Sequence, residues 1–370
     1  MTKQTNQRLY SLDALRGFDM FWIAGGAGIF AALAGATDSG LIDWIEQQTH
    51  HVEWEGFRLY DLIFPLFLFI SGVSFPFSLA SRKAKGQTRK QIYRHVIQRG
   101  VVLVLLGIVY NGFFTRDFAD LRFASVLARI GLGWMFAALI VMNARLVWQA
   151  IWCGGILLIY YAAMMLIPVP GYGAGVLTPE GSLASYIDQL LLPGKLYFGT
   201  LDPEGILSTL PAVSTALLGM LTGELLKEKE NRIGRFLKLY IMAGSGVALV
   251  LLALLWNFSF PIIKNLWTSS FVLLTGGVSL LFLSLFYLVL DIWKIRFWAY
   301  PFRIIGLNPI TIYLAQAGMI SFWSTSNYFF GHFFKSVSDT YFDFWMACAY
   351  FLVSWLFLYF LHRQKIYLKV

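Results

Sequence analysis

The segment from His50 to Asp61 carries the densest group of side chains that could transfer protons. It contains two histidines, three carboxylates and one tryptophan: His50, His51, Glu53, Trp54, Glu55 and Asp61. Histidine titrates near neutral pH, and a neighbouring carboxylate can fix its tautomer and raise its basicity. The pattern suits proton removal from an amine or a hydroxyl, although surface histidines beside acids are also common. Adjacent histidines without a further spaced His or Cys match metal-ligand spacing poorly, so we expect no metal.

A second acidic group, Asp202-Pro203-Glu204-Gly205, stands immediately before an apolar segment. In one interpretation Asp202 caps a helix, Pro203 occupies the first helical position and Glu204 favours the positive helix end. In the other, these carboxylates share a site with His51.

Charged residues also occur inside apolar segments, where each is costly and is therefore a functional candidate. Asp13 and Arg16 are three residues apart and share one helical face. They are interpreted either as an interfacial ion pair or as part of an anion site. Arg129 and Arg303 lie in segments expected to occupy the cytoplasmic half or the middle of the membrane.

The Asn308-Pro309 step predicts an interrupted helix, because Pro309 lacks a donor and disfavours helical geometry at Asn308. Interrupted helices at membrane depth often line binding sites. Proline kinks without a ligand are also common, and both interpretations stay open here.

The elements that carry these residues are apolar helices. The 370 residues are 58% hydrophobic and 13% charged, which excludes an ordinary globular domain. A span needs about 20 apolar residues, and we predict an all-α integral membrane protein of about ten transmembrane helices. The expected spans are Ser11 to Leu33, Leu59 to Ala80, Arg99 to Phe114, Ala124 to Met142, Leu146 to Ile167, Gly205 to Leu225, Phe236 to Trp256, Leu266 to Leu290, Trp298 to Ile320 and Trp345 to Leu361.

Most of the 29 Lys and Arg residues fall in alternate connections. Because positive residues near span ends are retained in the cytoplasm, we predict that both termini are cytoplasmic. The net charge of +9 is explained as a topology signal that also favours anionic membrane lipid, and we expect no nucleic-acid partner. We expect one transmembrane domain over 1–370, with long external loops at 34–58, 168–204 and 321–343.

Several motifs resemble the transmembrane acetyltransferases typified by heparan-α-glucosaminide N-acetyltransferase, together with their bacterial relatives. They are S-L-D-A-L-R-G at Ser11 to Gly17, H-V-E-W-E-G at His51 to Gly56, D-L-I-F-P-L-F-L-F-I-S-G at Asp61 to Gly72, L-R-F-A-S-V-L-A-R-I-G at Leu121 to Gly131 and D-P-E-G-I-L-S-T at Asp202 to Thr209. Their order and spacing agree over nearly the whole chain.

The resemblance implies acetyl transfer from cytoplasmic acetyl-CoA, as co-substrate, to the amine of a glucosamine-type sugar or oligosaccharide on the periplasmic side of a bacterial inner membrane. It places the active-site histidine at His51. In the mechanism that we expect, His51 is the general base, and Asp61 or Glu53 orients it. The candidate acetyl-CoA-binding residues are Arg16, Arg99, Arg129, Arg303 and Asn308, and the candidate sugar-binding residues are Trp54, Asp202 and Glu204. It also suggests a homodimer. An asparagine that accompanies the histidine in the lysosomal enzyme has no clear counterpart in Ile23 to Ala27.

Two other functions stay open. An amino-sugar transporter without acetyl transfer would use the interrupted helix and the intramembrane charges. A non-catalytic membrane scaffold would explain the abundant Trp and Tyr at span ends.

Overall fold

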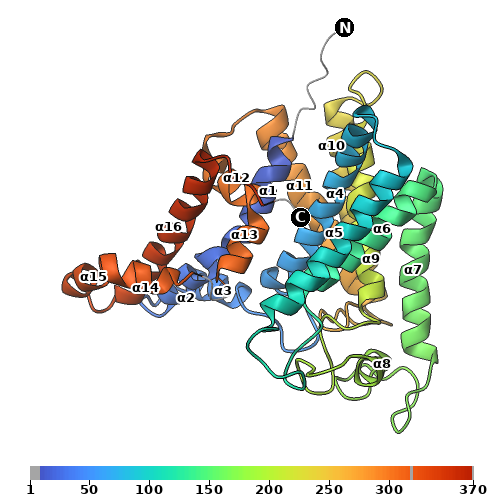
Figure 1. Ribbon diagram of the computed structural model, residues 1–370, viewed down its shortest axis with the longest axis horizontal. Coiled ribbons are helices and arrows are strands. Elements are labelled where there is room, and N and C mark those ends of the chain that lie inside the picture. Colours follow the sequence, from blue (N-terminus) through green and yellow to red (C-terminus); the bar gives the residue numbers. More distant parts are fainter. Residues whose placement is uncertain (1–8, 317–319, 369–370) are drawn as a thin grey trace. The chain divides into compact units, whose positions relative to one another are not determined.

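The computed structural model describes residues 9–316 and 320–368, and these residues are helical without a regular strand (Figure 1). In this described part, nine helical stretches are long and apolar enough to cross a membrane. They are Tyr10–Ala34, Leu59–Ala84, Arg89–Tyr110, Val126–Asn143, Leu146–Leu166, Thr209–Lys227, Arg235–Trp256, Ser269–Ile292 and Phe342–Arg363. Each matches one of the expected spans, so the prediction of a multi-span helical protein is confirmed.

The remaining expected span, 298–320, is not one continuous helix. It contains the 3₁₀ turn η4 (Phe297–Ala299) and two short helices, α12 (Tyr300–Leu307) and α13 (Pro309–Leu314). Asn308 separates the two helices with φ −134° and ψ 50°, and Pro309 opens α13. The interruption predicted from Asn308-Pro309 is therefore confirmed, while residues 317–319 of this segment lie outside the described residues.

The first span also contains an irregular turn. It consists of α1 (Tyr10–Phe21), the π-helical turn η1 (Trp22–Gly26) and α2 (Ala27–Ala34). Gly25 has φ 131° inside this turn, a conformation that glycine adopts without a Cβ clash. Three of the basic residues counted in the charge pattern, Lys3, Arg8 and Lys369, lie outside the described residues.

The chain forms two compact units, which we describe separately. Unit 1 contains the described residues up to Val52, the short stretch Arg58–Ile63 and the chain from Phe282 onward. Its other elements are α3 (Gly40–Gln48), η2 (Leu59–Leu62), η3 (Leu288–Ile292), α14 (Phe322–Ser326), η6 (Asn327–Gly331), α15 (His332–Val337) and α16 (Phe342–Arg363). The consecutive segments α14, η6 and α15 lie across the N-terminal end of α16 (Figure 1).

Unit 1 is organised by a close crossing of α1 and α12. A Cβ placed on Gly17 would lie 1.6 Å from the carbonyl oxygen of Phe302, and one placed on Gly306 would lie 2.0 Å from the carbonyl oxygen of Asp13. Glycines at these positions therefore let the two backbones touch, as small residues do between membrane helices. This crossing brings the start of α1 against the helix that carries Arg303.

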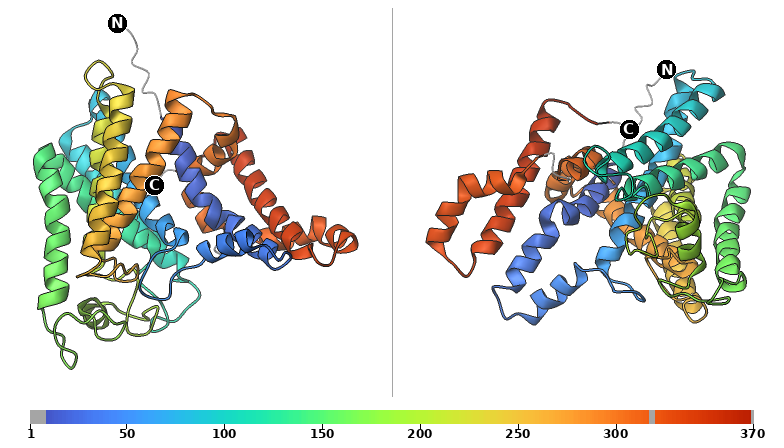
Figure 2. Two further views of the ribbon diagram at one scale, coloured as in Figure 1. Left: turned by 180° about the vertical axis from the view of Figure 1, so that it is seen from behind. Right: turned by 60° about the horizontal axis from the view of Figure 1, so that its bottom comes forward.

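Unit 2 contains residues 53–57 and 64–281. Its elements are α4 (Ile63–Ala84), α5 (Arg89–Tyr110), α6 (Val126–Asn143), α7 (Leu146–Leu166), α8 (Leu183–Leu191), α9 (Thr209–Lys227), α10 (Arg235–Trp256) and the greater part of α11 (Ser269–Tyr287). The most buried of these are α4 and α9, whose backbones meet at Gly72 and Gly219. Helices α10 and α11 run side by side and approach closely at Gly246 and Gly277 (Figure 2).

The two ends of unit 2 differ in charge. The short connections α4–α5, α6–α7 and α9–α10 lie at one end, and together with the helix ends beside them they hold most of the Lys and Arg residues of unit 2. The longer connections 111–125, 167–208 and 257–268 lie at the other end, where α8 is embedded in the second of them (Figure 1). We call the first the basic end and the second the loop end. The three segments that the sequence predicted as long external loops, 34–58, 168–204 and 321–343, each contain at least one short helix.

Candidate functional site

His51 and Asp61 form a hydrogen-bonded pair in unit 1. Nδ1 of His51 lies 2.7 Å from Oδ1 of Asp61. The Asp61 side chain is fully buried, whereas the His51 side chain is 50% exposed. Asp61 belongs to the 3₁₀ turn η2, which leads directly into α4, so the carboxylate is carried by a helical element and not by a free loop.

The chain around this pair closes on itself. Oδ2 of Asp61 accepts a hydrogen bond from the backbone N–H of Arg58 at 3.0 Å, and Nη1 of Arg58 donates to the carbonyl oxygen of His51 at 3.3 Å. The Tyr60 ring centroid lies 4.8 Å from that of His51. Because a carboxylate only accepts, the pairing assigns the proton to Nδ1 and leaves the lone pair of Nε2 as the basic site.

The residues on either side of this pair have other contacts. His50 hydrogen-bonds through Nε2 to Glu46 of α3, so the adjacent histidines have separate partners. Glu53 is exposed. Of the two carboxylates that the sequence offered for orienting His51, Asp61 is the one that contacts it.

Trp54 is anchored in unit 2. Its Nε1 donates to the carbonyl oxygen of Leu177 at 3.0 Å, and its ring packs on a buried apolar cluster that includes Tyr160 and Phe260. The neighbouring backbone is also held, since the N–H of Gly56 donates to the carbonyl oxygen of Ile262 at 2.9 Å. The segment after His51 is therefore attached to the loop end.

Asp202 and Glu204 both bind Arg122, a residue that the sequence analysis did not select. Nε and Nη2 of Arg122 donate to the two oxygens of Asp202 at 2.7 and 2.6 Å, and Nη2 also contacts Glu204. Burial lowers the pKa of this guanidinium, but the hydrogen bonds to Asp202 and the charges of Glu204 and Asp202 outweigh that effect and raise it. The only sequence signal for Arg122 was its position in the Leu121 to Gly131 motif.

Asp202 does not cap the sixth span, because α9 begins at Thr209 with Ser208 at the capping position. Instead Asp202 is fully buried and accepts backbone N–H groups from Glu204 at 3.0 Å and from Tyr197 at 3.3 Å. With Arg122, these donors occupy both of its oxygens. Glu204 keeps a partly exposed side chain.

Asp188 of α8 also holds the segment that contains Asp202. Its carboxylate accepts the backbone N–H groups of Ile206 at 2.9 Å and of Asp202 at 3.4 Å. Burial raises the pKa of Asp188 to about 6, although these backbone hydrogen bonds oppose the shift. The segment 202–208 is thus fixed by side chains from α8 and from the connection before α6.

Three of the five candidate acetyl-CoA residues belong to unit 1. Nη1 of Arg16 lies 3.4 Å from Oδ1 of Asp13 and donates to the carbonyl oxygen of Gly306 at 3.3 Å. The Arg303 guanidinium stacks 4.8 Å from the centre of the Tyr10 ring. The Asp13–Arg16 pair suggested by their shared helical face is therefore present, and the contact of Arg303 with Tyr10 adds a second arginine at the start of α1.

Asn308, the third of them, binds the C-terminal segment. Its Nδ2 donates to the carbonyl oxygen of Ile366 at 3.0 Å, and its Oδ1 accepts the N–H of Leu368 at 3.1 Å. The side chain is 1% exposed. The interruption of the helix is thus covered by the chain that follows α16.

The other two candidates, Arg99 and Arg129, belong to unit 2. Arg99 lies midway along α5, with its guanidinium 4.1 Å from the centre of the Trp134 ring. Arg129 lies in the first turn of α6 and contacts Ser208, which precedes α9. It was expected in the cytoplasmic half or the middle of the membrane. It lies at the loop end because Ser125 caps α6 only four residues earlier.

The chain is similar in sequence to two curated enzymes. No protein-family model matches the chain. The heparan-alpha-glucosaminide N-acetyltransferase of Mus musculus is 27% identical over 321 residues, and that of Homo sapiens is 26% identical over 328 residues. Each alignment covers 72% of this chain and 48% of the relative. The chain is a distant relative of these acetyltransferases. It spans about half the length of the curated relatives it matches.

Four of the five motifs quoted from the sequence meet in pairs in the structure. The His51 to Gly56 and Asp61 to Gly72 motifs each contribute one member of the histidine–carboxylate pair. The Leu121 to Gly131 and Asp202 to Thr209 motifs are joined by Arg122 and Arg129. Motifs separated by about 80 residues in sequence thus form common clusters.

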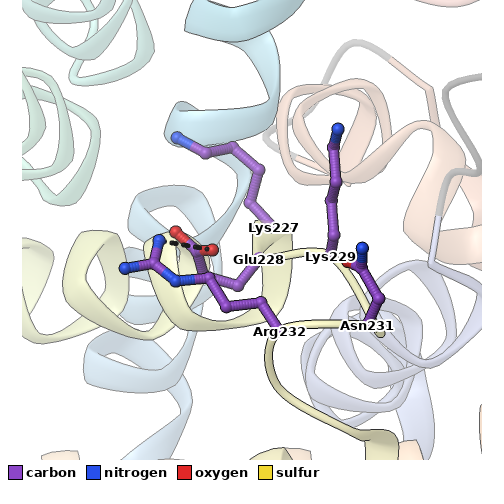
Figure 3. A pocket seen from close by; sticks show the side chains of 5 residues that line it. All are labelled: Lys227, Glu228, Lys229, Asn231 and Arg232. Atoms are coloured by element: carbon purple, nitrogen blue, oxygen red, sulfur yellow. Dashed lines mark hydrogen bonds and ion pairs between the residues drawn. The ribbon is translucent and has the colours of Figure 1, made fainter.

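The basic end of unit 2 is hollowed at the connection between α9 and α10. A shallow depression of about 450 Å³ there is lined by the polar side chains of Lys227, Glu228, Lys229, Asn231 and Arg232 (Figure 3). Arg232 pairs with Glu228 at 3.0 Å, and Lys227 pairs with Glu224. The surface is positive overall but partly neutralised.

Proposed function

We propose that this protein is a transmembrane N-acetyltransferase. In this proposal it moves an acetyl group from cytoplasmic acetyl-CoA to the amine of a glucosamine-type sugar on the periplasmic side of a bacterial inner membrane. The observation that carries the proposal is the His51–Asp61 pair, in a chain that is 27% identical over 321 residues to a heparan-alpha-glucosaminide N-acetyltransferase. The membrane-spanning helices and the basic connections at one end of unit 2 support the two-sided arrangement.

The chemistry assigned to His51 is general base catalysis. Nε2 accepts a proton from the sugar amine as its nitrogen attacks the thioester carbonyl. The C–N bond forms, the C–S bond breaks, and the departing CoA thiolate receives the proton from His51. Asp61 holds the tautomer and stabilises the imidazolium. Glu53 remains our alternative orienting residue.

A transient acetyl-histidine is the alternative route. In that case Nε2 attacks the thioester first, and the amine then displaces the imidazole. Stopped-flow mixing with acetyl-CoA alone separates the routes, because stoichiometric CoA release without an acceptor requires the acetyl-enzyme.

The proposed donor contacts come mainly from the arginines near the cytoplasmic ends of spans. CoA carries several phosphate charges, and guanidinium groups bind phosphate with charge-assisted hydrogen bonds. We assign this role to Arg16 and Arg303, with Arg99 deeper in the membrane and Asn308 as a candidate donor to the thioester. Arg129 was grouped with these residues by the sequence, and we propose a different role for it below.

The proposed acceptor contacts are Trp54, Glu204 and Asp202. A sugar ring can stack on an indole, and a carboxylate can bind its hydroxyls or its ammonium group. Glu204 is the more accessible of the two carboxylates, whereas Asp202 acts mainly by holding Arg122 and the turn. The functional form in this proposal is a homodimer in which 1–370 acts as one acyltransferase-like domain with cytoplasmic termini.

Calorimetry and product analysis test this function together. Purified protein in detergent should bind acetyl-CoA and should release CoA only when glucosamine is added, with N-acetylglucosamine as the product. Folded protein that neither binds nor turns over acetyl-CoA contradicts the proposal.

A transporter is the second candidate, and the interruption between α12 and α13 favours it. Uptake of labelled glucosamine or N-acetylglucosamine into proteoliposomes without acetyl-CoA would support transport. Acetylation that depends on acetyl-CoA across the same vesicles would support the transferase.

A further inference from the structure

Arg129 is a buried cation without a carboxylate partner among the described residues. Its side chain is 1% exposed, although it lies in a membrane-spanning helix. Nη2 donates to Oγ of Ser208 and approaches the carbonyl oxygen of Gly205 at 3.5 Å. Within the described residues, Nε and Nη1 have no hydrogen-bond partner. A charge buried in this way costs several kcal/mol unless another group compensates it.

Arg122 has the direct carboxylate partners that Arg129 lacks. Arg122 lies in the same motif, and the two carboxylates of the 202–208 segment both bind it. Arg129 contacts the same segment but receives only neutral oxygens. The fold therefore gives the outer arginine direct carboxylate partners, whereas the charges of Glu204, Asp202 and Asp188 act on the inner one only without direct contact.

The Arg129 side chain is held in place, as a binding group must be. Its guanidinium lies 4.9 Å from the centre of the Trp267 ring. Trp267 is itself buried, and its Nε1 donates to Oγ1 of Thr215 at 3.3 Å. Its backbone has φ 53°, an unusual conformation for a bulky residue. The indole thus fixes the plane of the guanidinium while leaving donors unused.

The position along α9 decides which substrate can reach Arg129. Ser208 precedes this helix and Lys227 ends it, so its 19 residues separate Arg129 from the basic end by about 28 Å. The loop end also holds Trp54, Asp202 and Glu204, the proposed acceptor contacts.

We propose that Arg129 binds a negatively charged oxygen of the reacting substrates at the loop end, using the donors of Nε and Nη1. This inference rests on the proposed function and names the residue that supplies positive charge there. The charge has two possible sources. It is either permanent, on an acidic substituent of the acceptor, or transient, on the thioester carbonyl oxygen as the amine attacks.

Acetylation kinetics of Arg129→Gln with two acceptors separate these sources. Glucosamine is neutral apart from its amine, and glucosamine 6-phosphate carries an additional anion. A transient oxyanion predicts that kcat falls about 10²–10³-fold with both acceptors, as for the loss of one oxyanion donor. A permanent anion predicts that only glucosamine 6-phosphate loses affinity and kcat/KM. Arg116→Gln is the matched control, because Arg116 is exposed in the connection before α6.

Thermal unfolding distinguishes binding from a structural role. Arg129→Met should unfold at the same or a higher temperature than the wild type, because it removes a buried charge that has no direct carboxylate partner among the described residues. A large fall in its melting temperature would assign Arg129 to structure and overturn the proposal. Arg129→Lys, which keeps the charge but loses the guanidinium geometry, should recover part of the lost activity.

The anion site at Arg129 can be tested even if the protein does not transfer acetyl groups. If wild-type protein shows no acetyl transfer, calorimetry with glucosamine and glucosamine 6-phosphate still compares the wild type with Arg129→Gln. Preference for the phosphorylated sugar that disappears in Arg129→Gln supports the anion site. If Arg129→Gln matches both the wild type and Arg116→Gln in every available measurement, the proposal is wrong.

Discussion

Nδ1 of His51 lies 2.7 Å from Oδ1 of Asp61, and only the histidine of this pair reaches solvent. The buried carboxylate is therefore placed to control the tautomer of an exposed base. Asp61 reaches this position because the turn that carries it is closed by Arg58.

Replacing Asp61 by Asn should lower kcat by about 10²–10⁴-fold, the range contributed by general acid–base catalysis. The amide can donate to Nδ1 and so favours the tautomer that leaves Nε2 protonated. His51→Ala should lose a similar factor, and His51→Ala/Asp61→Asn should lose little more than either change alone. Steady-state acetylation of glucosamine measures this. Asp43→Asn in α3 is an exposed control, and full activity in folded His51→Ala would remove His51 from the mechanism.

The crossing of α1 and α12 predicts sharply different outcomes for two glycines of one span. Gly17→Ala places a methyl group where the carbonyl oxygen of Phe302 lies, so the helices must separate. Overpacking of this kind costs about 1–3 kcal/mol or more. Gly28→Ala has no neighbouring atom within 4 Å of the new Cβ and should be tolerated. Thermal unfolding in detergent compares the two, and equal stability would contradict the close crossing.

Arg122→Ala should destabilise the loop end of unit 2. It leaves Asp202 fully buried without its guanidinium partner, a change that typically costs about 3–5 kcal/mol. Arg116→Ala, at an exposed position, should have little effect. Adding Asp202→Asn to Arg122→Ala should recover part of the loss because it removes the unpaired charge. Limited proteolysis in the 168–204 connection and thermal unfolding report both effects.

The pKa of Asp188 predicts a pH dependence of stability. The ordinary carboxyl value is 3.8, and burial raises the value in the folded protein to about 6. Between these values the folded state binds more protons than the unfolded state, so stability from this group falls as pH rises from about 4 to 6. Asp188→Asn removes that group and should flatten this part of the profile. Melting temperatures of both proteins from pH 4 to 7 test the difference, and parallel profiles would contradict it.

Much of the fold could be predicted from composition, because lipid demands long apolar helices with internally satisfied backbones. The interruption at Asn308 was also predictable, since the proline effect is local. The short helices inside the long connections were not. Ser182, for example, caps α8 within a stretch rich in Gly and Pro, and those residues masked the helix signal.

The candidate site was only partly predictable, because its contacts depend on tertiary structure. The sequence offered both Glu53 and Asp61 as orienting carboxylates, and the contact is made by Asp61, which is the more distant of the two along the chain and lies in the turn η2. Arg122 was missed because its partners lie 80 and 82 residues away. Asp202 was interpreted as a helix cap because the intervening turn that ends at Ser208 gave no separate signal.

The position of Arg129 has an electrostatic consequence. It lies in the first turn of α6 and against Ser208, the residue that precedes α9. The N-terminus of each helix carries a partial positive charge of about half an elementary charge, and a cation there is repelled. Two helix dipoles therefore act against the same guanidinium, while the charges of Glu204, Asp202 and Asp188 act in its favour. An anion bound to Nε and Nη1 would add to that favourable interaction.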